Sequence, residues 1–264
     1  MPIGEFEREV LRLLAVNRNP ESFIGGATVV LQAPDSPRRS EDIDLFHDTQ
    51  ASLQSSVDSD VKALTVAGYS CTITTRQLTF CRAYVDRGDQ STKLEWVYDS
   101  AFRFFPVEPD LDLGWRLNFW DAATNKVLAF AGRTALRDYV DVVYLHQRHL
   151  HLGALAWAAA GKDPGITPEM IIEGGRRNAR FPGEDLTKLH LSQPLDFRDL
   201  KQIYIQAADE AEAIFERLPP QDVGCLYLDA TRQPVCPDPD SPQFAGLTKH
   251  FGRVKGAWPT IVLD

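Results

Sequence analysis

The sequence predicts an α+β protein in which a small unit of strands and helices is followed by a mainly helical region. Strand-like and helix-like apolar patterns alternate over roughly the first 100 residues. From about Asp121 onward the composition becomes helical. The chain has 264 residues, of which 44% are apolar and 25% are charged, as is usual for a globular protein with a buried core. We therefore expect two domains, over residues 1–110 and 111–264.

The order of the expected elements follows from apolar periodicity and from the positions of glycine and proline. The N-terminal elements are a helix over 4–16, a strand over 23–26 that enters a glycine turn, a brief helix over 27–32, a strand over 42–46, a helix over 49–67, a hairpin over 69–85 and a strand over 93–99. Residues 106–114 (PVEPDLDLG) resemble a linker. Helical patterns follow over 121–133, 134–149, 152–162, 167–177 and 197–218.

Charge and composition limit the partners and the compartment. The net charge of −9 argues against a broad, sequence-independent contact with nucleic acid, although a local basic cleft is compatible with it. No apolar run of 18 or more residues occurs, so we expect no membrane span. The first residues lack a signal-peptide pattern, and the four cysteines show no CxxC spacing. These features predict a cytoplasmic protein with reduced cysteines.

Two aspartates in the strand-like run DIDLF are the first candidates for chemistry. Asp42 and Asp44 are two residues apart, so on a strand both side chains point to the same face. Neighbouring carboxylates repel each other unless water covers them or a cation lies between them. The strand therefore has either a solvated polar face or a site for Mg²⁺, which prefers hard oxygen ligands.

A glycine pair precedes this strand. Gly25 and Gly26 follow the strand pattern of Phe23 and Ile24 and open a helical pattern. Glycine allows the backbone to approach an anion closely, and the start of a helix presents free N–H groups. A triphosphate in the glycine turn would then meet metal on the aspartates, which is the arrangement that nucleotidyl transfer needs. An ordinary turn is the alternative.

A second charged segment lies on a predicted helix–turn–helix. Lys126 and Arg133 are seven residues apart and would share a face if one helix contained both. Arg137, Asp138 and Asp141 place both signs of charge on the following helix. An ion-pair network with a purely structural role is the alternative reading of this segment.

Together the two segments resemble nucleotidyltransferases of the AbiEii/AbiGii toxin group, within the polymerase-β-like superfamily. The residues that carry the resemblance are Gly25, Gly26, Arg38, Ser40, Asp42 and Asp44, then Lys126, Arg133, Arg137, Asp138 and Asp141. The resemblance covers roughly residues 1–145. It implies a nucleotidyltransferase domain with a small mixed sheet and helices, followed by a helical C-terminal domain that contributes Lys126 and Asp141 to the cleft. One departure is Thr28, which stands one position later than the hydroxyl residue in many relatives, so its contact with phosphate is in doubt.

The resemblance also implies roles for these residues. Asp42, Asp44, Lys126 and Asp141 would be catalytic. Asp42 and Asp44 would bind Mg²⁺, and a third carboxylate from a neighbouring strand would join them; Glu95 is the candidate and Asp99 its competitor.

The remaining roles concern the nucleotide. The implied nucleotide-binding residues are Gly25, Gly26, Arg38, Ser40, Lys126 and Arg137. Asp141, with Asp138, would orient Lys126 or activate the acceptor hydroxyl.

The predicted activity is Mg²⁺-dependent transfer of a nucleoside monophosphate from an NTP to an acceptor hydroxyl. The acceptor is the 3′ end of a tRNA or a protein hydroxyl. By resemblance the protein is the toxin of a toxin–antitoxin or phage-defence system, with a cognate antitoxin as a possible partner. Two alternatives stay open: an inactive nucleotidyltransferase-like binding module, and a small-molecule nucleotidyltransferase of the antibiotic-modifying type.

Overall fold

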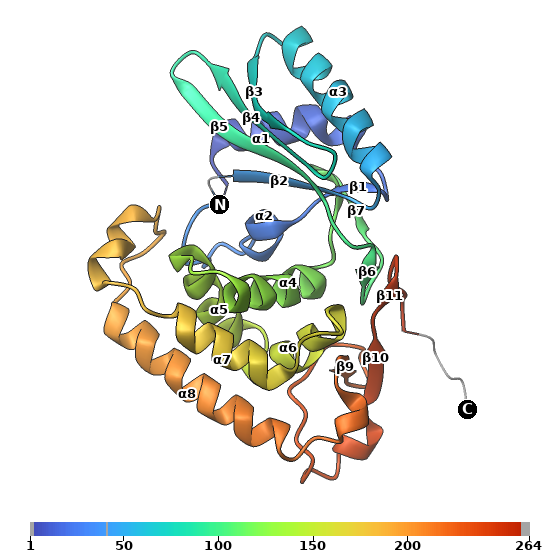
Figure 1. Ribbon diagram of the computed structural model, residues 1–264, viewed down its shortest axis with the longest axis vertical. Coiled ribbons are helices and arrows are strands. Elements are labelled where there is room, and N and C mark those ends of the chain that lie inside the picture. Colours follow the sequence, from blue (N-terminus) through green and yellow to red (C-terminus); the bar gives the residue numbers. More distant parts are fainter. Residues whose placement is uncertain (1–2, 41, 260–264) are drawn as a thin grey trace. The chain divides into compact units, whose positions relative to one another are not determined.

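A mixed sheet of seven strands forms the centre of the N-terminal part of the chain (Figure 1). The computed structural model describes residues 3–40 and 42–259. Contacts divide the chain into two compact units, the first comprising the residues up to Ala101 with Pro106–Ala122, and the second comprising Phe102–Phe105 with the residues from Ala123 onward. The α+β fold class is confirmed. The domain boundary expected near residue 110 stays a prediction.

The sheet of the first unit has the strand order β3-β4-β5-β2-β1-β8-β7. Its strands are β1 (Ser22–Ile24), β2 (Asp42–His47), β3 (Ser70–Arg76), β4 (Phe80–Arg87), β5 (Gln90–Tyr98), β7 (Glu108–Asp110) and β8 (Gly114–Arg116). The central pair, β2 and β5, is parallel, and β2 pairs antiparallel with β1. The sheet is therefore mixed.

The central strands alternate between buried and half-exposed residues, as a sheet with one covered face requires. On β2, Ile43 and Leu45 are buried, and on β5 Leu94 and Trp96 are fully buried. The helices α1 (Glu5–Leu14) and α3 (Gln50–Val66) cover this apolar face (Figure 1). The short helix α2 (Gly26–Val30) lies at the opposite, polar face.

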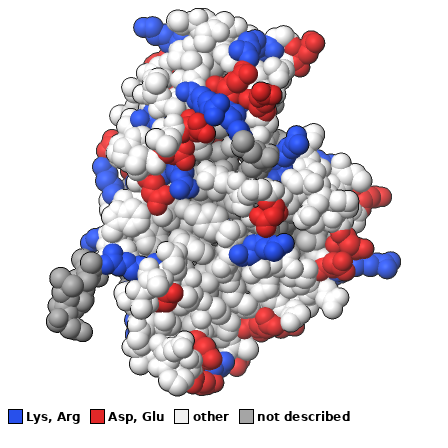
Figure 2. All heavy atoms as spheres, turned by 180° about the vertical axis from the view of Figure 1, so that it is seen from behind, with Lys and Arg blue, Asp and Glu red and all other residues white. Residues whose placement is uncertain are grey.

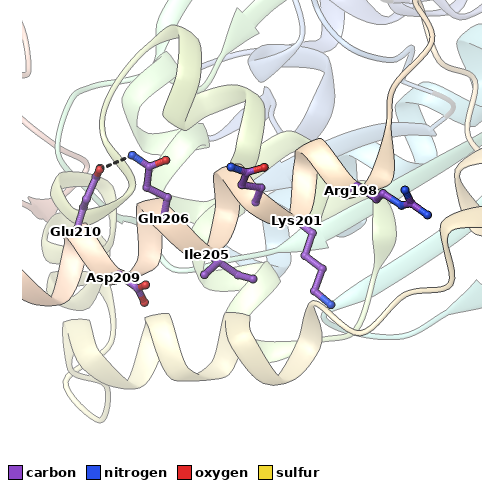
Figure 3. A pocket seen from close by; sticks show the side chains of 7 residues that line it. Arg198, Lys201, Ile205, Gln206, Asp209 and Glu210 are labelled. Carbon is purple, nitrogen blue, oxygen red and sulfur yellow. Dashed lines mark hydrogen bonds between the residues drawn. The ribbon is translucent and has the colours of Figure 1, made fainter.

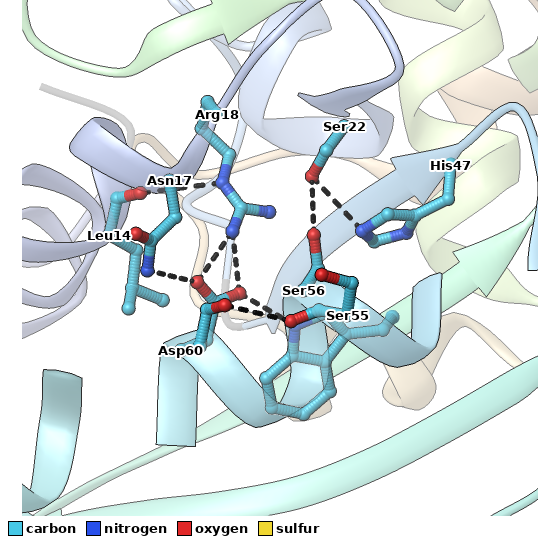
Figure 4. A network of polar contacts seen from close by, with 10 residues as sticks. Leu14, Asn17, Arg18, Ser22, His47, Ser55, Ser56 and Asp60 are labelled. Atoms are coloured by element: carbon cyan, nitrogen blue, oxygen red, sulfur yellow. Dashed lines mark hydrogen bonds and ion pairs between the residues drawn. The ribbon is translucent and has the colours of Figure 1, made fainter. Parts of the chain in front are cut away.

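A closed polar network is buried beneath α3 (Figure 4). The Arg18 guanidinium donates from Nη2 to both carboxylate oxygens of Asp60 at 2.6 Å, and both side chains are completely buried. Asn17 and the indole N–H of Trp96 also donate to Asp60, each at 2.8 Å. The network ties the N-terminal segment, α3 and β5 together.

The segment expected to be a linker instead forms the hairpin β7–β8. An Asx-type turn closes it, because Asp110 Oδ1 accepts from the backbone N–H groups of Asp112 and Leu113. The hairpin joins the sheet edge through a parallel pairing of Ile24 with Arg116. The expectation of a linker at residues 106–114 was therefore wrong.

The second unit is mainly helical, as predicted. Its helices are α4 (Phe119–Gly132, of which residues from Ala123 belong here), α5 (Leu136–Arg148), α6 (Leu152–Ala159), α7 (Pro168–Asn178) and α8 (Phe197–Phe215). Every residue of α6 is buried, and this helix packs against α5, α7 and α8. Two small sheets complete the unit: β9 (Cys225–Leu228) with β10 (Thr248–Phe251), and β6 (Phe102–Arg103) with β11 (Arg253–Val254). No helix within the described ranges 3–40 and 42–259 is both long and apolar enough to cross a membrane.

Candidate active site

The glycine turn lies directly against the aspartate strand. The Gly25 N–H donates to the Asp44 carbonyl at 3.2 Å, and Gly26 has a φ of +63°. A Cβ atom at Gly26 would lie 2.4 Å from Asp44 Oδ2, and one at Gly25 would lie 2.6 Å from the Phe46 ring. Both glycines are therefore needed for this close approach, and at Gly26 the left-handed backbone conformation is a second reason.

Asp42 and Asp44 lie on the same face of β2, as predicted from their spacing. Both are half-buried, while the intervening Ile43 is buried on the other face. The parallel register places Lys93 beside Asp42 and Glu95 beside Asp44 on β5. The polar face of the sheet thus carries three carboxylates on two adjacent strands.

Glu95, rather than Asp99, is the sheet neighbour of Asp44. Glu95 Oε1 accepts from Arg82 Nε at 2.7 Å and lies 3.1 Å from Lys93 Nζ. Asp99 lies beyond the end of β5, where its N–H donates to the carbonyl of His47 at the far end of β2. The role of Glu95 as a third metal ligand stays a prediction.

The Asp42 and Asp44 carboxylates are donors of the kind that hold magnesium together with phosphate oxygens. In the stretches that the structure describes, no group of three or more His, Cys, Asp or Glu side chains converges as a ready-made metal site. Mg²⁺ is commonly held by only one or two carboxylates, with water and substrate phosphates as the remaining ligands. Asp42 and Asp44 share a half-exposed face and supply oxygens of that kind. They are the residues that would hold the ion.

Lys93 is a component of this face that the sequence analysis did not single out. Its Nζ lies 2.9 Å from Asp42 Oδ2 and 3.1 Å from Glu95 Oε1. Burial alone would lower the pKa of Lys93, but its contacts with Asp42 and Glu95 outweigh burial and raise it. The signal was present in KLEWVYD, where Lys93 and Glu95 are two apart and share a face.

Arg38 and Ser40 are both buried in the loop that leads into β2. Arg38 is 3% exposed and donates from Nη1 to the carbonyl of Arg39 at 3.0 Å. The Ser40 hydroxyl donates to the Asp42 carbonyl at 3.1 Å. These bonds hold the backbone of the loop that leads into β2. Contacts of the two residues with nucleotide stay predictions. Thr28 is 1% exposed within α2.

In the second unit, Lys126 is held between two buried aspartates. Its Nζ lies 3.0 Å from Asp138 Oδ1 and 3.0 Å from Asp141 Oδ2, and both carboxylate side chains are completely buried. Lys126 comes from α4 and both aspartates come from α5. The three residues named by the sequence analysis are thus brought together, with the lysine fixed in place.

Arg133 adds a second cation to this cluster. Because α4 ends at Gly132, one helix does not contain both Lys126 and Arg133, yet Arg133 Nε donates to Asp138 Oδ2 at 2.7 Å. Burial alone would raise the pKa of Asp138, but Lys126 and Arg133 outweigh it and lower the pKa. Arg137 is half-exposed on α5, and its contact with nucleotide stays a prediction.

Comparison with protein families decides the class of the protein. Residues 15–221 match the family described as "Nucleotidyl transferase AbiEii toxin, Type IV TA system". The chain belongs to the AbiEii family. It is a nucleotidyltransferase toxin, and the predicted family membership is confirmed. Comparison with curated proteins gives no significant sequence match.

Solved structures share the fold of this AbiEii-family chain. MenT4, a nucleotidyltransferase toxin from Mycobacterium tuberculosis H37Rv, is 12% identical with a TM-score of 0.58, over 82% of this chain and 83% of that one. JHP933 from Helicobacter pylori is 19% identical with a TM-score of 0.50, over 80% of this chain and 91% of that one. At such identities the likeness shows the fold alone. It agrees with the predicted nucleotidyltransferase fold.

The surface of the AbiEii-family chain does not present one broad field of positive charge on the face shown in Figure 2, where Lys and Arg alternate with Asp and Glu. A shallow hollow runs along α8 (Figure 3). It is lined by Arg198, Lys201, Gln202, Ile205, Gln206, Asp209 and Glu210. None of the predicted site residues lines this hollow.

Proposed function

We propose that this nucleotidyltransferase toxin carries out a Mg²⁺-dependent transfer of a nucleoside monophosphate from an NTP to an acceptor hydroxyl. The acceptor oxygen forms a bond to the α-phosphorus, the bond from that phosphorus to the β-phosphate oxygen breaks, and pyrophosphate leaves. The observation that carries the proposal is the close approach of the Gly25–Gly26 turn to Asp44. With this approach, a phosphate bound by the turn would lie next to a metal ion bound by Asp44.

The residues of the first unit would bind and orient the triphosphate. Gly25 and Gly26 leave room beside Asp44, because neither carries a Cβ. Asp42 and Asp44 would hold Mg²⁺, which when bound neutralises charge on the phosphate oxygens. Most of the acceleration in such reactions comes from positioning and charge neutralisation, which the rigid central strands of a sheet are well placed to provide.

Lys126 would neutralise phosphate charge. Asp138 and Asp141 each lie 3.0 Å from its Nζ, which fixes the direction of a long, flexible side chain. The alternative role for Asp141, as a base that activates the acceptor, is less favoured, because its side chain is completely buried against the Lys126 ammonium, out of reach of an acceptor hydroxyl. Asp141 is then a positioning residue.

The acceptor is proposed to be the 3′ end of a tRNA or a protein hydroxyl, and the type IV family suggests a cognate antitoxin. The net charge of −9 favours a small local contact with RNA over a large footprint. Binding to tRNA through a few phosphates should weaken as salt is raised.

The test is incorporation of label from each of four α-labelled NTPs, with Mg²⁺ or with EDTA, in the presence and absence of total tRNA. Label in tRNA or in protein that requires Mg²⁺ and is lost in Asp44→Asn would support the proposal and identify the acceptor. Lys62→Met, on the exposed side of α3, serves as the control that retains activity. Transfer that persists in EDTA would refute the metal dependence, and label found only on a small-molecule acceptor would refute the proposed acceptors.

A further inference from the structure

Lys93 bridges two of the three carboxylates on the polar face of the sheet. Parallel pairing of β2 with β5 sets Lys93 beside Asp42, and Lys93 and Glu95 point to the same face of β5. Nζ then lies 2.9 Å from Asp42 Oδ2 and 3.1 Å from Glu95 Oε1. The side chain is 20% exposed, so solvent reaches the bridge. Lys93 therefore contacts the same Asp42 carboxylate that would hold a metal ion.

The carboxylates need a cation whether or not metal is bound. Asp44 and Glu95 are register neighbours on adjacent strands, so like charges stand side by side. Arg82 neutralises Glu95 from β4 at 2.7 Å, and Lys93 links Glu95 to Asp42. Lys93 thus pairs with Asp42 and Glu95, and Asp44 lies against the glycine turn.

Lysine is suited to a contact that must be exchanged. Its ammonium is a compact, strongly hydrated point charge on a flexible four-carbon stem, whereas arginine forms fixed planar forks. A triphosphate next to the Gly25–Gly26 turn would offer Nζ a new anionic partner. Movement of the ammonium to phosphate would release Asp42 for the metal without leaving any charge unpaired.

We propose that the Lys93 ammonium pairs with Asp42 in the metal-free protein and competes with divalent metal for this carboxylate. When the triphosphate binds, metal displaces Lys93 from Asp42. The inference rests on the proposed function, since it assumes that Asp42 and Asp44 hold metal. Its consequence is a coupling of binding: the protein alone binds metal weakly, and the NTP strengthens metal binding by giving Lys93 another partner. By linkage, metal strengthens NTP binding by the same factor.

The test measures binding of Mn²⁺, as a spectroscopic substitute for Mg²⁺, by electron paramagnetic resonance with and without a non-hydrolysable NTP analogue. Wild type is compared with Lys93→Met and Lys93→Gln, which remove the charge, with Lys93→Arg, which retains it, and with Lys62→Met as the matched control. In the absence of nucleotide, we expect the neutral variants to bind Mn²⁺ roughly five- to tenfold more tightly, a modest factor because a half-exposed ion pair is screened by solvent. The analogue should strengthen Mn²⁺ binding more in wild type than in these variants.

A second readout uses the metal-free protein. Without metal, Lys93→Met and Lys93→Gln should melt at a lower temperature than wild type, and Mg²⁺ should restore more of their stability than it adds to wild type. If the two neutral variants show the same change in melting temperature, a packing defect peculiar to one of them is excluded as the cause. Equal Mn²⁺ affinity in wild type and neutral variants would overturn the inference and leave the proposed function standing. Absence of Mn²⁺ binding in every variant, with the analogue present, would overturn both.

Discussion

Two clusters of cations and carboxylates occupy opposite faces of the same sheet in the first unit, and they differ in burial. On the covered face, Arg18 and Asp60 are completely buried, and Asn17 and Trp96 also donate to Asp60 (Figure 4). On the polar face, Asp42, Lys93 and Glu95 form a bridge whose side chains are 14–20% exposed. The chemical groups are alike, but only the second cluster is open to solvent.

The comparison separates a structural cluster from a functional one. The Asp60 carboxylate has three donors in a fixed arrangement beneath α3. Loss of Arg18 would leave its buried charge unpaired, because Asn17 and Trp96 are neutral donors. The Asp42 carboxylate is 20% exposed, so water reaches it and the proposed exchange of its lysine for metal has a route. Solvent access, more than the presence of paired charges, is therefore the property that favours the polar face as the proposed binding site.

The largest expected effect on stability is at Asp60. Asp60→Ala should lower the free energy of unfolding by about 3–5 kcal/mol, because it leaves the Arg18 guanidinium buried without its carboxylate. Urea denaturation measures this change. The matched control is Asp58→Ala on the same helix, whose pair with Arg76 is 68% and 42% exposed. We expect the control to cost less than about 1 kcal/mol. Equal losses in the two variants would remove the distinction between the clusters.

The next effect is a pH dependence from the covered face. His47 is completely buried, its Nε2 lies 3.0 Å from the Ser22 hydroxyl, and burial, assisted by the nearby Arg18 charge, lowers its pKa from 6.5 to about 4. Between pH 6.5 and 4, His47 is therefore protonated in the unfolded chain but remains neutral in the folded protein. Stability should be unaffected above that window and fall by up to about 3 kcal/mol across it as the pH decreases.

NMR titration of the His47 imidazole tests this directly, without a substitution. A midpoint near the ordinary histidine value would show that the covered face admits water, and it would contradict the proposed difference between the faces. Denaturation curves across the same pH range supply the corresponding stability change.

The smallest effect on stability is expected at the glycine turn. A substitution at this turn should have a large effect on activity. Gly26→Ala should lower the free energy of unfolding by roughly 1–2 kcal/mol, because alanine would adopt a left-handed conformation. The new Cβ would lie 2.4 Å from Asp44 Oδ2 and would therefore displace that carboxylate. Nucleotidyl transfer should fall roughly 100-fold, since small displacements of positioning groups have effects of that size. Gly68→Ala is the matched control, because Gly68 has a φ of +83° and no atom within 4 Å of an added Cβ. If both variants retained activity, Asp44 would not depend on the turn.

Much of this architecture is encoded in local patterns. The alternation in DIDLF and KLEWVYD predicts β2 and β5, and it places Asp42 with Asp44 on a shared face. FIGG predicts the turn between β1 and α2. These predictions succeed because strand periodicity and glycine conformations depend on a few neighbouring residues.

The errors and omissions involve partners that are distant in the sequence. The hairpin β7–β8 resembled a linker because its Pro and Asp residues are typical of loops, and its pairing partner, Ile24, lies about 90 residues earlier. Asp60 ends the polar stretch SSVDSD of a predicted helix, yet in the structure Arg18 and Trp96 contact it from other elements. Local periodicity contains no information about such pairings.

The sequence by itself determined the family, the glycine turn and the face on which each candidate carboxylate lies, since these follow from residue identity and short-range geometry. The tertiary structure decided which charges meet. The parallel register of β2 with β5 put Lys93 against Asp42, and the packing of α4 with α5 closed Asp138 and Asp141 around Lys126. The physical reason is that ion pairs form between side chains within about 4 Å in space, and chain folding rather than sequence order sets those distances.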